Sequence, residues 1–404
     1  MKKTILLGVL MLLTICGWAQ QTMVSGTVLD ADTHKAIAGA SVKTGKVSVI
    51  TNDDGFFTIK SEQPINTIRI SHLGYRARRI NVAGQQDVQQ KILLRPATIQ
   101  LTEVLVTASN ARELVEAAMS RIPENYSLQK ELYSCFYREK VLKRHNYISV
   151  AEGVIDMYKN SYKNGVEYDK VAIRKGRRLL SPKRSDTLSV KVIGGPSAAL
   201  RLDVVKNADF LLNEEELNRY ELKLEVPTML ADRPQYVISL SPRVTMPYAM
   251  YYGKIYIDQQ SLAFTRFELE LDMSDREKAT ALMLVKKPRG LRFKPKELSC
   301  IVDYRTDDDG LTRISYISNT FRFNCDWKRR LFATSFTAYC EMAVTSHTHE
   351  NVHPIRGRDN FDQRDAFFDQ VDYFRDPTFW QDYNIIEPTE SLDKVINKLL
   401  KKHR

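Results

Sequence analysis

The chain has 404 residues, and 60 lysines and arginines against 49 aspartates and glutamates give it a formal net charge of +11. This length suggests two or three domains with a large core. Basic residues are scattered rather than gathered in stripes, which argues against a nucleic-acid surface. Two alternatives stay open for the excess charge: an anionic envelope surface or lipid headgroup as partner, or a surface that is simply solvated.

Residues 1–19 are predicted to be a secretory signal peptide. A lysine pair precedes an apolar run that ends at Cys16, and small residues stand before a cut after Ala19. Cys16 raises the alternative of a lipid-anchored form, but Ile15 occupies the position where a lipid-modified cysteine normally follows a small residue. Export to the periplasm or outer-membrane periphery is therefore expected. No later stretch approaches twenty uninterrupted apolar residues, so no transmembrane helix is expected in the mature chain.

Four cysteines follow the signal peptide, at Cys135, Cys300, Cys325 and Cys340. They lack the close spacing of a zinc site, and a chain of this size does not need a disulfide framework. Buried free thiols are expected. The alternative is a single bridge among Cys300, Cys325 and Cys340.

Residues 20–96 read as short strands at regular spacing, as in "MVSGTVLD" and "GFFTIKS". Runs of five to seven residues separated by Gly, Asn and Asp turns indicate an all-β sandwich of the transthyretin or immunoglobulin kind.

Four segments of this region, in this order, resemble the carboxypeptidase-regulatory-like domain. They are Gly26-Thr27-Val28, the string from Ala36 to Val42, the turn from Thr51 to Phe56, and Ser71-His72-Leu73-Gly74-Tyr75. Ala36 departs from the proline that is common there. The resemblance implies a small sandwich and not a peptidase, because the His-x-x-Glu zinc motif of carboxypeptidases does not occur in the sequence.

The acidic turn Asn52-Asp53-Asp54-Gly55 has two possible interpretations. Asn and Asp bond their own backbone at tight turns, and Gly tolerates positive φ there. A calcium loop needs about six oxygen ligands, whereas this turn offers three side chains. A plain turn is expected, and likewise for Asp307-Asp308-Asp309-Gly310.

Residues 97–126 are predicted to join the two domains through a strand and a helix. Leu101 to Thr107 resembles the segment near the TonB box of Bacteroidetes outer-membrane receptors, but too few residues follow for the plug and barrel of such a receptor. Residues 111–121 form an amphipathic helix with Asn110 as its N-cap, and Pro123 ends it. Its apolar stripe is expected to pack on the second domain.

Residues 127–404 are predicted to form a large antiparallel β domain with a C-terminal helix. Ten alternating segments rich in Tyr, Phe, Ile and Val, with short connections, indicate a large curved sheet or half-barrel. The stretch from Ser197 to Asn218 reads as one or two helices.

Two weaker resemblances accompany this domain. The hairpin from Tyr251 to Leu271, with Arg266 and Glu268 on its second strand, is similar to the central strands of periplasmic lipoprotein-carrier half-barrels. The order of the two domains, with "DYFRDPTFWQDYNIIEP" near the end, resembles an exported Bacteroidetes family of unassigned function, which offers no catalytic residues to carry over.

His347, His349 and His353 are the candidate metal ligands of the chain. On a strand, His347 and His349 would point the same way, with His353 and Glu350 nearby, as zinc or copper would require. The cluster lies where a strand runs into a polar loop, so the alternative is a loop that happens to be rich in histidine. No catalytic residue and no cofactor are predicted.

The last forty residues carry three further features. Asp365, Asp369, Asp372 and Asp376 fall near helical spacing, but interleaved aromatic residues favour an amphipathic tail docked on the sheet. Residues 379–386 are expected to cover an open barrel end. A final helix is expected over 391–402, with a basic end suited to its dipole.

These patterns predict a mainly β protein that binds or scaffolds rather than catalyses. It would hold a lipid, a glycan or a protein segment, and an outer-membrane protein is a possible partner. One alternative is a metal-dependent hydrolase built on the three histidines. The other is an accessory to TonB-linked outer-membrane uptake.

Overall fold

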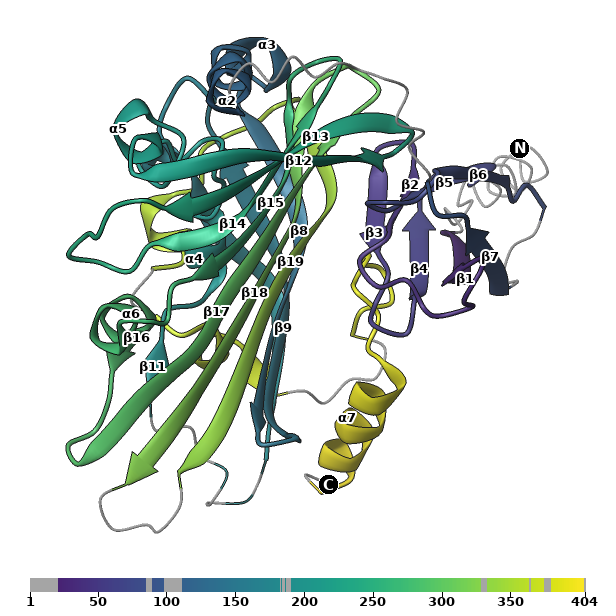
Figure 1. The fold of residues 1–404 in the computed structure, drawn as a ribbon. Coiled ribbons are helices and arrows are strands. Elements are labelled where there is room, and N and C mark those ends of the chain that lie inside the picture. The colour runs from purple at the N-terminus through teal and green to yellow at the C-terminus, as the bar shows by residue number, and fades with distance from the viewer. Residues whose placement is uncertain are drawn as a thin grey trace.

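The structure, a computed structural model, describes residues 21–84, 89–97, 111–181, 183, 186, 190–327, 333–362, 365–373 and 379–402. The predicted signal peptide, Asn110 and the segment from Leu101 to Thr107 lie outside these residues. Within them the protein is mainly β, with a small two-sheet sandwich beside a large open antiparallel sheet (Figure 1).

The sandwich packs a three-stranded sheet, in the order β4-β1-β7, on a four-stranded sheet, in the order β3-β2-β5-β6. Inward side chains of both sheets, such as Val28, Phe57 and Ile68, form one buried core. Alternation along β1 explains this packing, because every second residue is buried. The strands are β1 (Thr22–Asp30), β2 (Ser41–Thr44), β3 (Val47–Ile50), β4 (Phe56–Ser61), β5 (Thr67–Ser71), β6 (Arg78–Asn81) and β7 (Gln89–Leu94).

The large sheet runs in the order β12-β13-β14-β15-β17-β18-β19-β8-β9-β10-β20 and does not close. All neighbours pair antiparallel except the last, where the two-residue β20 pairs parallel with β10. Its strands are β8 (Glu131–Lys143), β9 (Asn146–Lys159), β10 (Lys170–Leu180), β12 (Tyr220–Leu230), β13 (Arg233–Pro242), β14 (Tyr251–Asp258), β15 (Phe264–Leu271), β17 (Leu291–Thr306), β18 (Thr312–Trp327), β19 (Thr334–Thr348) and β20 (Asp372–Tyr373).

The chain enters this sheet in the middle, at β8, and reaches one edge at β10. It then crosses to the opposite edge, at β12, and returns strand by strand until β19 pairs with β8. The crossover contains two short helices, α4 (Pro196–Leu200) and α5 (Glu214–Leu217), joined by turns. This agrees with the helices expected between Ser197 and Asn218, although each is only about one turn long.

Helices cover one face of the large sheet, and the sandwich with the C-terminal helix covers the other (Figure 1). We call these the helix face and the sandwich face. On the helix face, α2 (Ala111–Ser120) buries Val115 and Ala118 in the main core, as the sequence predicted. The other helices there are α3 (Ile122–Asn125) and α6 (Arg276–Met283), beside a two-stranded sheet of β11 (Lys191–Val192) and β16 (Leu284–Lys286).

The C-terminal segment wraps around the β10 edge of the sheet. Phe367 is fully buried on the helix face, over Gly153, where an added Cβ would lie 2.7 Å from the Phe367 ring. Phe367 and Phe368 therefore dock as expected, although the near-helical spacing of the aspartates does not correspond to an α-helix in residues 365–373. A 3-10 turn (Phe367–Gln370) and the short β20 stand in its place, because backbone pairing with β10 requires an extended chain. Asp376 lies outside the described residues.

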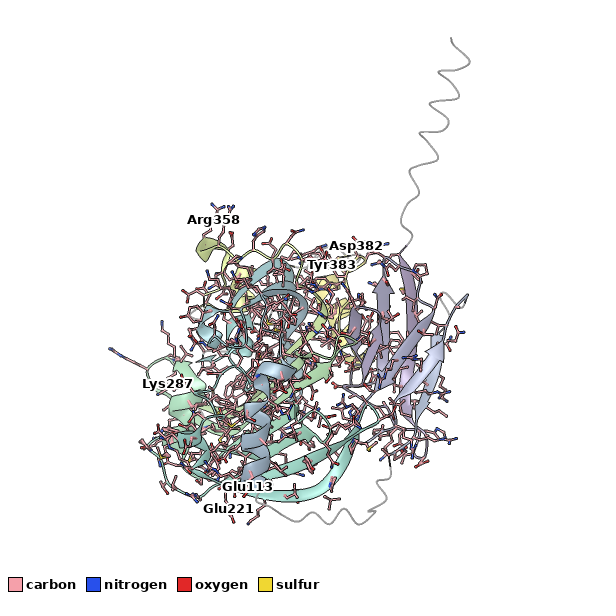
Figure 2. All side chains as sticks on the ribbon, turned by 90° about the horizontal axis from the view of Figure 1, so that it is seen from above. Glu113, Glu221, Lys287, Arg358, Asp382 and Tyr383 are labelled. Atoms are coloured by element: carbon pink, nitrogen blue, oxygen red, sulfur yellow. The ribbon has the colours of Figure 1, made fainter. Side chains whose placement is uncertain are left out.

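Residues 379–386 do not cover a barrel end, which corrects the prediction. Trp380, Ile385 and Ile386 are buried on the sandwich face in a cluster that includes Ile50 of the sandwich and Phe136 of β8. Figure 2 places Asp382 and Tyr383 beside the sandwich strands, where Lys60 donates to the Tyr383 carbonyl at 3.1 Å. The segment thus joins the two domains.

The chain ends in α7 (Glu390–Lys402), close to the predicted range. Leu392 and Ile396 of α7 are buried against Val150 and Leu179 of the large sheet. The amphipathic pattern is therefore satisfied on the sandwich face.

The sandwich also contacts the large sheet directly. Ser48 Oγ donates to the Val344 carbonyl at 2.9 Å, and Lys43 Nζ lies 3.0 Å from Asp307. The tip of the β12–β13 hairpin reaches the sandwich as well, where Gly74 N donates to the Met229 carbonyl at 2.8 Å. These contacts add to those of the C-terminal segment in holding the domains together.

Candidate functional site

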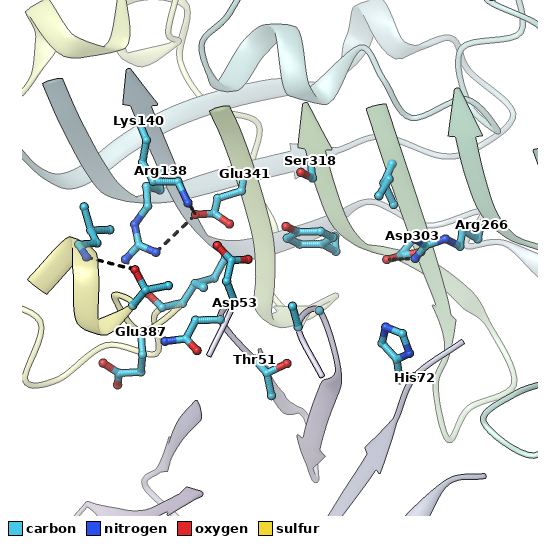
Figure 3. A pocket seen from close by; sticks show the side chains of 18 residues that line it. Thr51, Asp53, His72, Arg138, Lys140, Arg266, Asp303, Ser318, Glu341 and Glu387 are labelled. Carbon is cyan, nitrogen blue, oxygen red and sulfur yellow. Dashed lines mark hydrogen bonds and ion pairs between the residues drawn. The ribbon is translucent and has the colours of Figure 1, made fainter. Parts of the chain in front are cut away.

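A cleft of about 190 Å³ lies where the sandwich, the sandwich face of the large sheet and the C-terminal segment meet (Figure 3). The sheet supplies its floor, sandwich loops its roof, and residues 386–392 one wall. Its polar and charged lining residues are Thr51, Asn52, Asp53, His72, Arg138, Lys140, Arg266, Asp303, Tyr316, Ser318, Glu341, Glu387 and Thr389.

A second cavity of about 220 Å³ continues this cleft along the domain boundary, toward the β12–β13 hairpin. The two share Gly39, His72, Arg266 and Asp303 in their walls. We call the pair the interdomain cleft. Together the two parts reach the range of roughly 300–1,000 Å³ that is common for ligand sites.

A row of alternating charges crosses the sandwich face at one end of the cleft. The register pairs Arg177 with Glu152, Glu152 with Arg138, and Arg138 with Glu341. Opposite charges directly across neighbouring strands stabilise a sheet. Arg138 Nε lies 2.7 Å from Glu152, and Arg177 Nε lies 2.7 Å from the same carboxylate. We call these four residues the charge ladder.

The C-terminal segment seals the ladder from solvent. Arg138 Nη2 donates to the Ile386 carbonyl at 2.6 Å, and Trp380 Nε1 donates to Glu152 at 3.2 Å. Arg138 and Glu152 each keep 2% of their side-chain surface exposed. Burial would raise the pKa of Glu152, but Arg138 and Arg177 outweigh it and lower that pKa to about 2.

The ladder stops at Ser318, which pairs with Glu341 and is followed by Ile301 on the next strand. The cleft opens over this uncharged part of the floor (Figure 3). On its far side Arg266 Nη1 lies 2.8 Å from Asp303. The floor is therefore a slot with a hydroxyl in the middle and paired ions at both ends.

The ionisable groups around the slot respond mainly to burial. Burial raises the pKa of Asp303, although Arg266 opposes that rise, and burial raises the pKa of Glu387. Burial and the nearby Arg266 lower the pKa of His72.

The acidic turn at Asn52–Gly55 is a turn, as expected, and it also has a contact that the sequence did not reveal. Asn52 Oδ1 accepts from the backbone of Asp54 and Phe56, and Gly55 has φ of +73°. Asp54 accepts from the Glu390 backbone N–H at 2.7 Å, which caps the first turn of α7. The turn thus docks the C-terminal helix.

The structure does not bring the three candidate histidines together. His347 stacks near Tyr133, with ring centroids 5.8 Å apart, and its Nδ1 lies 3.9 Å from Asp307, while His349 and His353 are exposed. Across the described part of the chain, no group of three or more His, Cys, Asp or Glu side chains is placed to hold a metal ion. Cys135, Cys300, Cys325 and Cys340 are buried and free, as expected.

A further buried charge cluster lies beneath the helix face. Lys159 lies 2.5 Å from Asp203, and Lys206 lies 2.5 Å from Asp169. The hydroxyls of Tyr162 and Tyr304 donate to Asp203. The two lysines and the two aspartates match each other in charge, so we assign this cluster to folding.

The helix face holds a smaller, apolar pocket of about 90 Å³. Tyr137, Leu202, Leu282 and Phe321 are among its walls, between α4, α6 and the sheet. Glu139 lies beside it, where its carboxylate accepts from Tyr137 and from the Gly195 N–H, and burial raises its pKa.

Sequence reasoning did not find the interdomain cleft. Its floor comes from strands β8, β15, β17, β18 and β19, which the crossover brings together, and its roof comes from the other domain. One feature of the sequence does indicate the charge ladder. Arg138 and Glu152 stand within largely buried strands, and a buried charge needs a partner.

The family comparison agrees with one resemblance seen in the sequence. Residues 24–106 match the family model of the CarboxypepD_reg-like domain. This match confirms the sandwich assignment and covers well under half of the chain. No curated protein matches the sequence.

The solved structures to which the chain is similar are distant ones. The chain is similar to a domain described as an outer membrane lipoprotein-sorting protein from Vibrio parahaemolyticus, at 10% identity and a TM-score of 0.33, over 62% of this chain and 97% of that one. It is also similar to a LolA superfamily protein from Nitrosomonas europaea, at 12% identity and a TM-score of 0.21, over 57% of this chain and 94% of that one. Function is therefore argued from the site. In the described residues, no helix is both long and apolar enough to span a membrane.

Proposed function

We propose that the chain is an exported, non-catalytic binding protein whose interdomain cleft holds a neutral, hydroxyl-rich ligand such as a glycan segment. The balance of charge in the cleft carries the proposal. Three cationic side chains and four carboxylates line its first part, and four arginines and four aspartates line the second. The carboxylates there would repel an anionic ligand, and the arginines would repel a cationic one.

A hydroxyl group suits such a lining because it donates and accepts at the same time. Paired cations and carboxylates keep spare donors and lone pairs, and Ser318 and Tyr316 add hydroxyls to the floor. Many of the charged groups are held in ion pairs with one another, such as Arg266 with Asp303 and Lys140 with Glu341, which supports recognition without turnover. A protein segment would use the same groups through its backbone amides and is the nearest alternative ligand.

A lipid ligand is favoured less. The apolar pocket on the helix face has the right chemistry, but its 90 Å³ is well below the roughly 300 Å³ at which ligand sites begin. An acyl chain would enter only if α4 or α6 moved away from the sheet.

Binding to a panel of neutral glucose, mannose, galactose and N-acetylglucosamine oligomers, measured by calorimetry, tests the proposal. Ser318→Trp should fill the slot and abolish binding, whereas Ser335→Trp, exposed on β19 outside the cleft, should bind as the wild type does. The bound oligomer should be recovered intact by mass spectrometry. Cleavage of the oligomer, or undiminished binding by Ser318→Trp, would refute the proposal.

Intact-mass measurement of protein from a Gram-negative host would test export separately. Loss of residues 1–19 is expected, and a mass that retains them would contradict export.

A further inference from the structure

The outer edge of the sandwich carries a group of exposed cations. Strands β6 and β7 are the edge strands of the two small sheets, and both lie on the side away from the large sheet (Figure 1). Arg76 N donates to the Arg95 carbonyl at 3.0 Å, and Arg78 Nη1 donates to the Leu93 carbonyl at 2.9 Å, so the two segments lie side by side. The exposed basic residues on them, which we call the cationic edge, are Arg76, Arg78, Arg79, Lys91 and Arg95.

This edge is the end of a row of like charges. The register of the four-stranded sheet pairs Lys43 with Arg69, and Arg69 with Arg79. Like charges directly opposite each other on neighbouring strands destabilise a sheet unless anions or acceptors compensate them.

Compensation within the chain decreases along this row. Lys43 lies 3.0 Å from Asp307 and 3.3 Å from Asp308 of the large domain. Arg69 donates to the Ala231 carbonyl at 3.0 Å. Arg79, at the outer end, is exposed.

One acid from the large domain approaches the same edge. Asp232, at the tip of the β12–β13 hairpin, accepts from the Ala77 N–H at 2.9 Å. It leaves the five cations in clear excess. An external anion would offset the repulsion that the chain's own acids leave.

The shape of the edge indicates which kind of anion. Five cations spread along two exposed adjacent segments do not converge on a point, as they would around a single phosphate. An anionic bilayer presents phosphate groups over an extended surface rather than at one point. Each cation near such a surface contributes about a fivefold gain in binding.

We propose that the cationic edge binds the phosphate headgroups of an anionic membrane. The edge lies beside the second part of the interdomain cleft, because Arg79 pairs with Arg69, which lines that part. This inference is independent of the ligand proposed for the cleft.

Flotation with vesicles of phosphatidylcholine containing 30% phosphatidylglycerol tests the proposal. Wild-type protein should float with these vesicles at low salt, dissociate at 0.5 M NaCl, and not float with pure phosphatidylcholine. The triple variant Arg76→Gln, Arg79→Gln, Lys91→Gln should bind about a hundredfold more weakly. Arg78 is left intact because it bonds the Leu93 carbonyl, and equal melting temperatures would show that the variant is folded.

A matched control removes the same charge elsewhere. Lys286→Gln, Arg289→Gln, Lys296→Gln changes three exposed basic residues at the other end of the large domain, and it should float like the wild type. The single reversal Arg79→Glu should weaken flotation by more than tenfold and gives a second test with minimal change. Equal losses in both triple variants, unchanged flotation of the edge variant, or an edge that binds an oligonucleotide but not vesicles would overturn the proposal.

Discussion

Arg138 connects several elements on the sandwich face. Its guanidinium meets Glu152, Glu341 and the Ile386 carbonyl, and so links two neighbouring strands to the C-terminal segment. Burying such ions costs desolvation, so their contribution to net stability is small, whereas removing one partner leaves the others unpaired. The ladder also specifies register, because a slip of one residue along β8 would turn Arg138 to the apolar helix face.

Arg138→Met should destabilise the protein by about 3–5 kcal/mol, because Glu152 and Glu341 each lose a partner in a buried setting. Arg292→Met, at an exposed position on β17, is the matched control and should change stability by less than about 0.5 kcal/mol. Denaturant unfolding followed by intrinsic fluorescence would measure both. Equal stability of the two variants would show that the ladder is not a structural element.

The lowered pKa of Glu152 predicts that the stability of the protein depends on pH in the acid range. Its pKa is about 2 in the folded protein against a usual value of 4.5, so the unfolded chain binds the extra proton between those two values. The stabilisation that the ionised Glu152 contributes is therefore fully present above about pH 4.5. It is lost as the pH falls toward 2, which lowers the free energy of unfolding by about 3 kcal/mol in all.

Glu152→Gln should lower the melting temperature at pH 7, because it leaves Arg138 and Arg177 without their shared carboxylate. It should also flatten the decline of melting temperature between pH 4.5 and pH 2, since the titrating group is gone. Thermal scans across that range would show both effects. A decline as steep as that of the wild type would assign the acid sensitivity to other carboxylates.

At the scale of elements, the C-terminal segment acts as a strap. It leaves the helix face at β20, passes over the ladder, and ends in α7, whose first turn the sandwich caps through Asp54. Leu392 and Ile396 hold α7 to the large sheet. The strap therefore contacts both domains, and its removal should loosen their junction.

Leu392→Asp should release α7, because a carboxylate would be buried against Val150 and Leu179. Limited proteolysis should then cleave first within residues 379–402 and leave the sandwich intact. Asn397→Asp, exposed on the same helix, should resist cleavage as the wild type does. First cleavage elsewhere would show that α7 is not what holds the strap.

The same segments show how far sequence patterns reach. Alternation found the strands of both domains, and the amphipathic stripes found α2 and α7, because each of these elements buries one face. The docked aromatics of the segment around Phe367 were predicted as well, but its pairing with β10 was not, because the spacing of the aspartates gives no sign of an extended backbone.

Interactions between elements could not be predicted in the same way. The pairing of β19 with β8 joins two parts of the open sheet that are about 200 residues apart in the sequence. No local pattern indicates this pairing. The slot at Ser318 and Asp303 exists only once that sheet and the sandwich are assembled, so the candidate site was not visible in the sequence. The histidine cluster was visible, but its members diverge where β19 ends.

At the scale of the whole molecule, the two domains form one body with the interdomain cleft at their junction. The sandwich resembles a widespread module, but here it serves as the roof of a site whose floor belongs to the large sheet. Neither domain alone contains the cleft.

Hydrogen exchange followed by mass spectrometry, with and without the tightest-binding oligosaccharide of the panel, tests the central claim most directly. If the ligand binds in the interdomain cleft, we expect slower exchange of backbone amides around residues 51–53 of the sandwich and 316–318 of β18. Exchange in residues 193–202 should stay unchanged. Protection confined to residues 193–202, beside the apolar pocket, would contradict it.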